Sequence, residues 1–179
     1  RKRALPEKSP AEREQVALDM WGNMARLAAE YVFLDQIFDF DPDASEPGRI
    51  EVEGAETFFK LRDGNRPFIV FTAHTGNFEL LPVAAAAYGL DVMALFRPPN
   101  NPYIARRVLA ARRTSMGHLV PSRAGAAFTL ARRLEVGGGV GVLVDQKFHK
   151  GARTRFFGLE AQTNPLLAKL VRQFECEVY

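Results

Sequence analysis

The sequence predicts an α/β fold in which a mostly parallel or mixed sheet is flanked by helices and preceded by N-terminal helices. Two observations indicate this fold class. From residue 67 onward, short apolar segments of strand length alternate with segments of helical periodicity. Glycine, proline and asparagine stand between many of them, where turns and helix ends are expected. Such alternation is typical of layered folds with a largely parallel sheet, and 179 residues are enough for one sizeable core.

An amphipathic helix is predicted first along the chain. Ser9, Pro10 and Glu12 have the pattern of a capping box with proline at the first helical position. Apolar residues then recur at helical spacing up to about residue 33. They are Val16, Met20, Met24, Leu27 and Tyr31. This stripe has two interpretations: packing onto the main domain, or contact with a membrane surface or acyl chain.

Residues 41–48 are acidic and rich in turn formers, which indicates a connector. We therefore expect a helical segment with its connector at residues 1–48 and an α/β domain at residues 49–179. Because the chain begins with Arg1 and ends where a strand is starting, we expect it to be part of a longer protein that continues at both ends, so that the C-terminal part of the domain is missing.

The remaining elements follow from periodicity and from their stop signals. Gly89 closes one helix, and Asn101 with Pro102 opens the next. Strands are expected at residues 49–54, 67–72, 90–96, 118–121 and 140–144 and from residue 176, and helices at residues 54–61, 78–88, 101–114, 124–135 and 164–174.

Charge is distributed unevenly along the chain. Residues 1–96 contain 10 Lys or Arg and 16 Asp or Glu, whereas residues 97–179 contain 14 and 5. Eight arginines and no acid lie between residues 96 and 134. The planar guanidinium matches phosphate and carboxylate oxygens, so this half is expected to meet phosphorylated lipid, an acidic carrier protein or nucleic acid.

The single cysteine and the lengths of the apolar runs further limit the class of protein. Cys176 is the single cysteine, which excludes an internal disulfide and a thiolate metal site and fits a reducing compartment. No apolar run reaches the roughly 18 residues of a membrane-spanning helix, so an anchor, if the protein has one, is expected before Arg1.

The segment with the clearest chemical potential is residues 74–79, HTGNFE. On one continuous helix His74 and Glu79 would lie about 140° apart and could not meet. They can pair only if a turn separates them, and Gly76 and Asn77 permit a bend followed by a helix start. Glu79 would then orient His74 as a general base, with a substrate hydroxyl as nucleophile; the alternative is an ordinary polar turn.

Three polar residues, His74, Arg97 and Asp145, each follow a predicted strand. The carboxyl ends of parallel strands share one edge of the sheet, so these side chains are expected at the same edge. His118 and His149 have no partner at ligand spacing, and we predict no metal site.

Several ordered segments resemble one enzyme family. Residues 74–79 resemble the His–four residues–acid motif of glycerolipid-type acyltransferases, and residues 97–102 (RPPNNP) are similar to a block of the lauroyl/myristoyl acyltransferases of lipid A biosynthesis. Arg112 stands where that family has a further arginine. Residues 142–146 (VLVDQ), 155–158 (RFFG) and 163–164 (TN) also resemble its later blocks, so the likeness spans roughly residues 1 to 179.

The resemblance implies an acyl-acyl carrier protein-dependent O-acyltransferase that acylates a hydroxyl of a phosphorylated, Kdo-bearing lipid A precursor for lipopolysaccharide. It implies work at the cytoplasmic face of the inner membrane, with the anchor helix outside this chain, and no cofactor or metal. By motif position, His74 and Glu79 are implied as catalytic. The implied substrate-binding residues are Arg97, Asn100, Arg112 and Asp145.

Other interpretations remain open at this point. The same chemistry could serve another glycolipid or a lysophospholipid, and a family fold without activity could act as a scaffold. A nucleic-acid-binding module is disfavoured because the arginines are spread over two helices and a loop with few aromatic residues between them.

Helical geometry prevents Arg106, Arg107, Arg112 and Arg113 from all facing one site. Phe156 and Phe157 are expected either in the core or in the wall of an acyl-chain pocket.

Overall fold

The computed structural model describes residues 1–46 and 48–179, so Pro47 of the predicted connector lies outside the described residues. Its centre is a parallel five-stranded sheet with the strand order β3-β2-β4-β1-β7. The strands are β1 (Phe68–Thr72), β2 (Val92–Phe96), β3 (His118–Pro121), β4 (Gly139–Leu143) and β7 (Glu177–Val178). The predicted α/β class with a largely parallel sheet is therefore confirmed.

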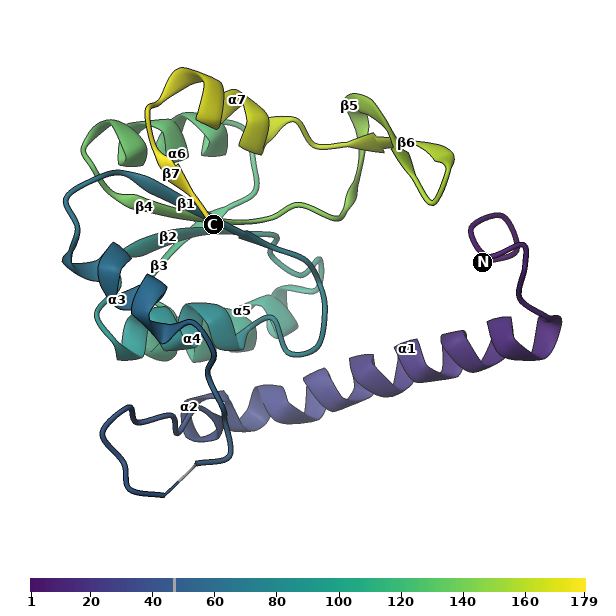
Figure 1. Ribbon diagram of the computed structural model, residues 1–179, viewed down its shortest axis with the longest axis horizontal. Helices are drawn as coiled ribbons and strands as arrows, with labels where there is room; N and C mark the ends of the chain where they lie inside the picture. The colour runs from purple at the N-terminus through teal and green to yellow at the C-terminus, as the bar shows by residue number, and fades with distance from the viewer. Residues whose placement is uncertain (47) are drawn as a thin grey trace.

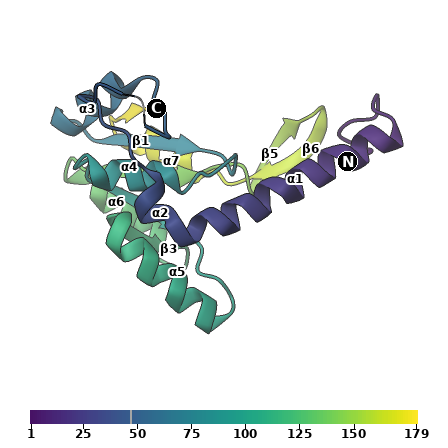
Figure 2. The same cartoon turned by 90° about the horizontal axis from the view of Figure 1, so that it is seen from below.

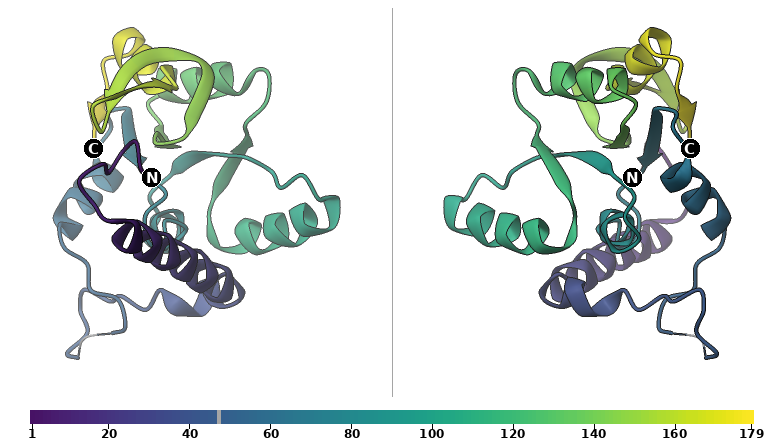
Figure 3. Two further views of the ribbon diagram at one scale, coloured as in Figure 1. Left: turned by 90° about the vertical axis from the view of Figure 1, so that its right-hand side faces the viewer. Right: turned by 90° about the vertical axis from the view of Figure 1, so that its left-hand side faces the viewer.

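Helices cover both faces of this sheet (Figure 1). One face carries α3 (Ala55–Asp63), α4 (Leu80–Ala87) and α5 (Pro102–Ser115), and the other carries α6 (Ala126–Glu135) and α7 (Leu166–Gln173). The two layers are also separated by the sheet in the end-on views of Figure 3. This double covering explains why the strands read as continuous apolar runs, since both of their faces are buried.

The core is divided by the alternation of side chains along β1 and β4. Ile69, Val140 and Val142 are buried with Leu130 of α6 and Leu170 of α7. Alternate strand residues point to opposite faces, so Phe68 packs with Leu61 of α3 and Ala85 of α4. The Phe68 ring lies against Gly139, where an added Cβ would come within 2.3 Å of the ring, so β4 needs glycine at this position.

The N-terminal segment consists of α1 (Pro10–Glu30), the 3₁₀ turn η1 (Tyr31–Phe33) and α2 (Leu34–Ile37). The predicted capping box is present, because Ser9 and Glu12 exchange side chain–backbone hydrogen bonds. Most of α1 extends away from the α/β body (Figure 2), and Ala17 is its one buried residue among those described. The packing interpretation of its apolar stripe is therefore wrong for Met20 and Met24, which are exposed. Only the end of the segment joins the core, through Leu34 beside Val83 and Met116.

One local expectation was wrong, and one element was not predicted. Residues 49–54 form no strand, because the backbone N–H groups of Arg49 and Ile50 donate to the Asp39 carboxylate instead of to a neighbouring strand. An antiparallel hairpin that the sequence did not predict is formed by β5 (Lys147–Phe156) and β6 (Leu159–Thr163). It is a separate two-stranded sheet that projects from the body (Figure 1). Among the described helices, none has the length and apolar character needed to cross a bilayer.

Candidate active site at the carboxyl edge of the sheet

The register of two neighbouring strands brings His74 and Asp145 together. Strands β1 and β4 pair with Thr72 opposite Leu143, so the residues two positions further along each chain are again opposite each other. The His74 Nδ1 atom lies 2.7 Å from Asp145 Oδ1, and the His74 backbone N–H donates to Asp145 Oδ2 at 2.9 Å. One carboxylate thus holds both the backbone and the ring of the histidine, which fixes the imidazole orientation.

The partners of the imidazole define its tautomer. Asp145 accepts at Nδ1, which places a proton there, and the Gln146 side-chain Nε2 lies 3.2 Å from His74 Nε2. Since the amide nitrogen is a donor, the Nε2 atom is left as the acceptor. An unprotonated Nε2 at a partly exposed site has the form needed for a general base.

The Asp145 carboxyl is suited to remain ionised. Partial burial acts to raise its pKa, but the hydrogen bonds from the His74 ring and the His74 N–H outweigh this effect, so the pKa of Asp145 lies below its ordinary value. The side chains of His74 and Asp145 are 30% and 37% exposed. A charged carboxylate on Nδ1 can therefore stabilise an imidazolium when Nε2 takes up a proton.

The expected pairing of His74 with Glu79 is wrong. Glu79 is buried, 5% exposed, and its carboxylate pairs with the guanidinium of Arg112 from α5. Arg112 also donates from Nε to the hydroxyl of Tyr31 at 2.7 Å. Its guanidinium lies 5.4 Å from the ring centre of Phe96, the last residue of β2. Glu79 thus anchors an arginine beside the site, while Asp145 takes the place next to the imidazole.

The turn between β1 and α4 joins these two pairs. Gly76 has a φ of 53°, a left-handed conformation that glycine adopts without steric cost, which agrees with the predicted bend. Asn77 accepts from the Glu79 N–H at 3.2 Å and donates from its side chain to Glu30, the last residue of α1, at 2.9 Å. The hydrogen bond between Asn77 and Glu30 therefore ties the turn to the N-terminal segment directly. Arg112 of α5 adds an indirect tie, because it contacts both Glu79 and Tyr31.

The other predicted residues occupy the same edge with fewer contacts. Arg97 directly follows β2, the neighbour of β4 on the side away from β1, so Asp145 lies between the strand ends that deliver Arg97 and His74. Arg97 and Asn100 are exposed. Asn101 caps α5 by accepting from Tyr103 N at 2.9 Å, which fixes the turn that carries them. Both side chains are therefore accessible to solvent next to the His74–Asp145 pair.

A model of the bacterial lipid A biosynthesis acyltransferases matches residues 2–179. The chain belongs to this family. The match covers the site, the sheet and the N-terminal segment, and it confirms the predicted family and the enzyme class, an acyltransferase of lipid A biosynthesis that acts with an acyl donor and a lipid acceptor. A comparison with curated proteins gave no match.

The arginines on α5 differ in their burial and in their partners. Arg112 is turned inward to Glu79, whereas Arg106 is exposed, which agrees with their large angular separation around the helix. The side chains of Arg107 and Arg113 lie outside the described residues.

Two further residues at the site, Tyr31 and Gln146, were not among the predicted site residues. Gln146 follows Asp145 directly, so its position was available from the sequence, but the contact of Tyr31 depends on how α1 is placed.

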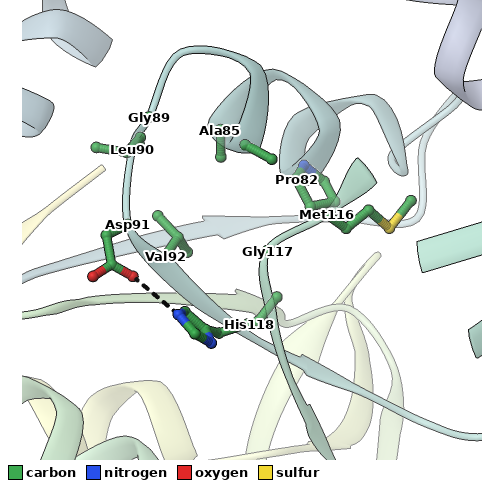
Figure 4. A pocket seen from close by; sticks show the side chains of 11 residues that line it. Pro82, Ala85, Gly89, Leu90, Asp91, Val92, Met116, Gly117 and His118 are labelled. Atoms are coloured by element: carbon green, nitrogen blue, oxygen red, sulfur yellow. Dashed lines mark ion pairs between the residues drawn. The ribbon is translucent and has the colours of Figure 1, made fainter. Parts of the chain in front are cut away.

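A cavity of about 260 Å³ lies elsewhere in the acyltransferase fold (Figure 4). Leu90, Val92 and Met116 contribute to its lining, and His118 and Asp91 stand at its edge with 3.9 Å between His118 Nε2 and Asp91 Oδ1. These residues precede or begin β2 and β3, so the cavity lies at the amino edge of the parallel sheet, opposite His74. It is separate from the His74–Asp145 pair. Within the described residues, no group of three or more His, Cys, Asp or Glu side chains could hold a metal ion.

Proposed function

We propose that this chain transfers a fatty acyl group from acyl-acyl carrier protein to a hydroxyl of a phosphorylated, Kdo-bearing lipid A precursor at the cytoplasmic face of the inner membrane. The observation that carries the proposal is the pairing of His74 Nδ1 with Asp145, which leaves Nε2 as an acceptor at the edge of the sheet. Among the described residues, the hydrogen-bond partners of this histidine are Asp145 and Gln146 and include neither Ser nor Cys, so in the proposal the acceptor hydroxyl itself is the nucleophile.

In the proposed reaction the substrate hydroxyl replaces the Gln146 amide at His74 Nε2 and gives its proton to that nitrogen as it attacks the thioester carbonyl. The new C–O bond forms a tetrahedral oxyanion, which donors at the edge of the sheet stabilise. When the C–S bond breaks, the carrier thiolate takes the proton from Nε2. Asp145 remains ionised throughout and stabilises the transient imidazolium.

The charged residues around the dyad have separate proposed roles. Arg97 and Asn100, exposed at the end of β2, bind phosphate or sugar oxygens of the acceptor. Glu79 acts through Arg112, which it neutralises and holds under the site, instead of through His74. The arginine-rich second half supplies attraction for both the anionic acceptor and the acidic carrier protein.

The test is a transfer assay with the full-length protein, acyl-acyl carrier protein and a Kdo-bearing lipid A precursor. His74→Ala is expected to lower turnover by about 10³-fold or more, because the general base is lost. Circular dichroism and thermal melting check that the variant is folded. Substantial turnover by folded His74→Ala contradicts the role of the histidine. Faster transfer to a lysophospholipid or another glycolipid than to the lipid A precursor contradicts the proposed acceptor.

A further inference from the structure

The β5–β6 hairpin exposes an unusual combination of side chains. Every residue of β5 except Gly151 is exposed. Phe148, Phe156 and Phe157 are 45%, 66% and 60% exposed. A two-stranded hairpin with solvent on both faces is only marginally stable by itself in water. The prediction of core packing for Phe156 and Phe157 is therefore wrong, whereas a contact with an acyl chain stays a prediction.

The tip of the hairpin holds its aromatic rings in a backbone conformation that phenylalanine rarely adopts. Strand pairing runs to Phe156 opposite Leu159, so Phe157 and Gly158 form a two-residue turn with φ values of 51° and 70°. Asn-Gly is the preferred sequence for such a turn. Among the described residues, Phe157 is the one non-glycine residue with positive φ. A bulky ring at this strained, exposed place indicates a function at the tip.

The charges of the hairpin complement an anionic surface. Residues 147–163 contain four Lys or Arg and one Glu. Strand pairing places Arg155 opposite Glu160 on one face, where Arg153 is also exposed, while Phe156 belongs to the other face. At the tip the rings of Phe156 and Phe157 meet edge to face, with 4.8 Å between their centres. The turn of the hairpin thus carries two aromatic rings, and the adjoining part of β5 carries two arginines.

The hairpin is also joined directly to the catalytic edge. Strand β5 begins at Lys147, immediately after Gln146, whose amide contacts His74. The hairpin and the exposed part of α1 extend from the body toward the same side in Figures 1 and 2. That part of α1 carries Trp21, which is 65% exposed. Whatever the hairpin binds is therefore held close to the site.

We propose that the β5–β6 hairpin is a membrane wedge. Phe156 and Phe157 enter the boundary between headgroups and acyl chains, and Lys150, Arg153 and Arg155 contact anionic lipid phosphates. A projecting tip needs no matching hollow to enter a bilayer, whereas a protein partner would need one, so the geometry favours a membrane. This inference rests on the proposed function, because it explains how a site at the hairpin base reaches a hydroxyl on a membrane-bound acceptor.

The test is co-sedimentation of the full-length protein with phosphatidylcholine vesicles, with and without phosphatidylglycerol. The variant Phe156→Ser/Phe157→Asn is expected to lower partition onto phosphatidylglycerol vesicles by about tenfold or more, because it removes the two rings that would insert into the bilayer. Arg153→Gln/Arg155→Gln is expected to weaken it only when phosphatidylglycerol is present, and added salt is expected to reduce that difference.

Stability separates a membrane role from a structural one. Asn accepts the positive φ of residue 157 more readily than Phe, so Phe157→Asn alone is expected to keep or raise the melting temperature while lowering vesicle binding. Phe128→Asn is the matched control, since Phe128 is 68% exposed on α6 and away from the hairpin. It is expected to leave vesicle binding unchanged.

A transfer assay with two forms of acceptor separates this inference from the proposed function. The hairpin variants are expected to lose transfer to acceptor in vesicles but to keep transfer to acceptor in detergent micelles, whereas His74→Ala loses both. Unchanged vesicle binding in Phe156→Ser/Phe157→Asn overturns the membrane wedge even if acyl transfer is confirmed. Loss of binding to acidic carrier protein with normal vesicle binding also overturns it.

Discussion

Two carboxylates lie near the carboxyl edge of the sheet, and they differ in their partners and in their access to water. Asp145 pairs with His74, and both side chains are about one-third exposed, at 37% and 30%. Glu79 pairs with Arg112, and these side chains are only 7% and 13% exposed. Proton transfer to a substrate needs access, whereas a buried ion pair stabilises geometry only when both partners are present. We therefore propose that the first pair carries out the proton transfer and that the second holds the shape of the site.

The largest expected effect tests the accessible pair. Asp145→Asn keeps an oxygen for the His74 backbone N–H but turns an amide NH₂ toward Nδ1, which favours the tautomer with the proton on Nε2. We expect kcat to fall by about 10²- to 10⁴-fold with little loss of fold, measured by the transfer assay and thermal melting.

Asp91→Asn is the matched control for this change. Asp91 also faces a histidine, with 3.9 Å to His118 Nε2, but at the opposite edge of the sheet. It is expected to leave kcat unchanged. Equal kcat in Asp145→Asn and wild type would remove Asp145 from the mechanism.

The second prediction concerns the buried pair. Glu79→Gln leaves the Arg112 guanidinium without its carboxylate, and we expect the free energy of unfolding to fall by about 3–5 kcal/mol in urea denaturation. Glu79→Gln/Arg112→Met is expected to recover much of this stability, because no unpaired buried charge remains.

Recovery of stability without recovery of activity in that double variant would show that Arg112 has a role in the reaction besides packing. Glu160→Gln, which breaks the exposed pair with Arg153, serves as the control, and its effect is expected to lie within experimental error. A Glu79→Gln protein as stable as wild type contradicts the structural role of the buried pair.

The parallel sheet was predictable because its signals are local. Apolar strands end at Thr72 and Phe96. Gly89 follows the helix after the first of these strands, and Asn101 begins the helix after the second, as the structure shows. The partner of His74 was not predictable, since it depends on β1 lying beside β4 in one register. A carboxylate five residues away was the nearest candidate in sequence, but Glu79 meets an arginine from α5 that local spacing cannot place.

The two missed elements have different causes. The hairpin at Lys147–Thr163 was missed because one of its strands is exposed and charged, so no alternation of buried and exposed residues marks it. The strand expected at residues 49–54 had such an alternation. It failed because the Asp39 side chain satisfies the backbone donors of Arg49 and Ile50. Local patterns cannot reveal this long-range competition for backbone hydrogen bonds.

A smaller effect is expected where the N-terminal segment meets the buried pair. Tyr31→Phe removes the hydroxyl that accepts from Arg112 Nε at 2.7 Å, and we expect a loss of about 1–2 kcal/mol in the free energy of unfolding. Burial, followed by the charge of Glu79, raises the pKa of Tyr31, so the hydroxyl stays protonated at neutral pH. Tyr103→Phe, at an exposed ring on α5, is the control. Identical losses in both variants would contradict the proposed tie between α1 and the site.

The smallest expected effect is the pH dependence of stability that Asp145 contributes. Because the pKa of Asp145 is lower in the folded protein than in the unfolded chain, its contribution is present above the unfolded value of about 3.9 and is lost as pH falls through the folded value. Melting temperatures of wild type and Asp145→Asn are therefore expected to differ by a constant amount at neutral pH and to converge below about pH 4.

Asp39→Asn provides the comparison for this last measurement. The hydrogen bonds from Arg49 also hold the pKa of Asp39 below its ordinary value, so its variant should converge with wild type over the same acid range. Asp39 lies far from the dyad in the chain and contacts Arg49, so this variant is expected to retain full transfer activity at neutral pH. If Asp145→Asn keeps a constant difference from wild type down to the lowest pH, Asp145 is not ionised beside His74, and the accessible pair cannot stabilise an imidazolium.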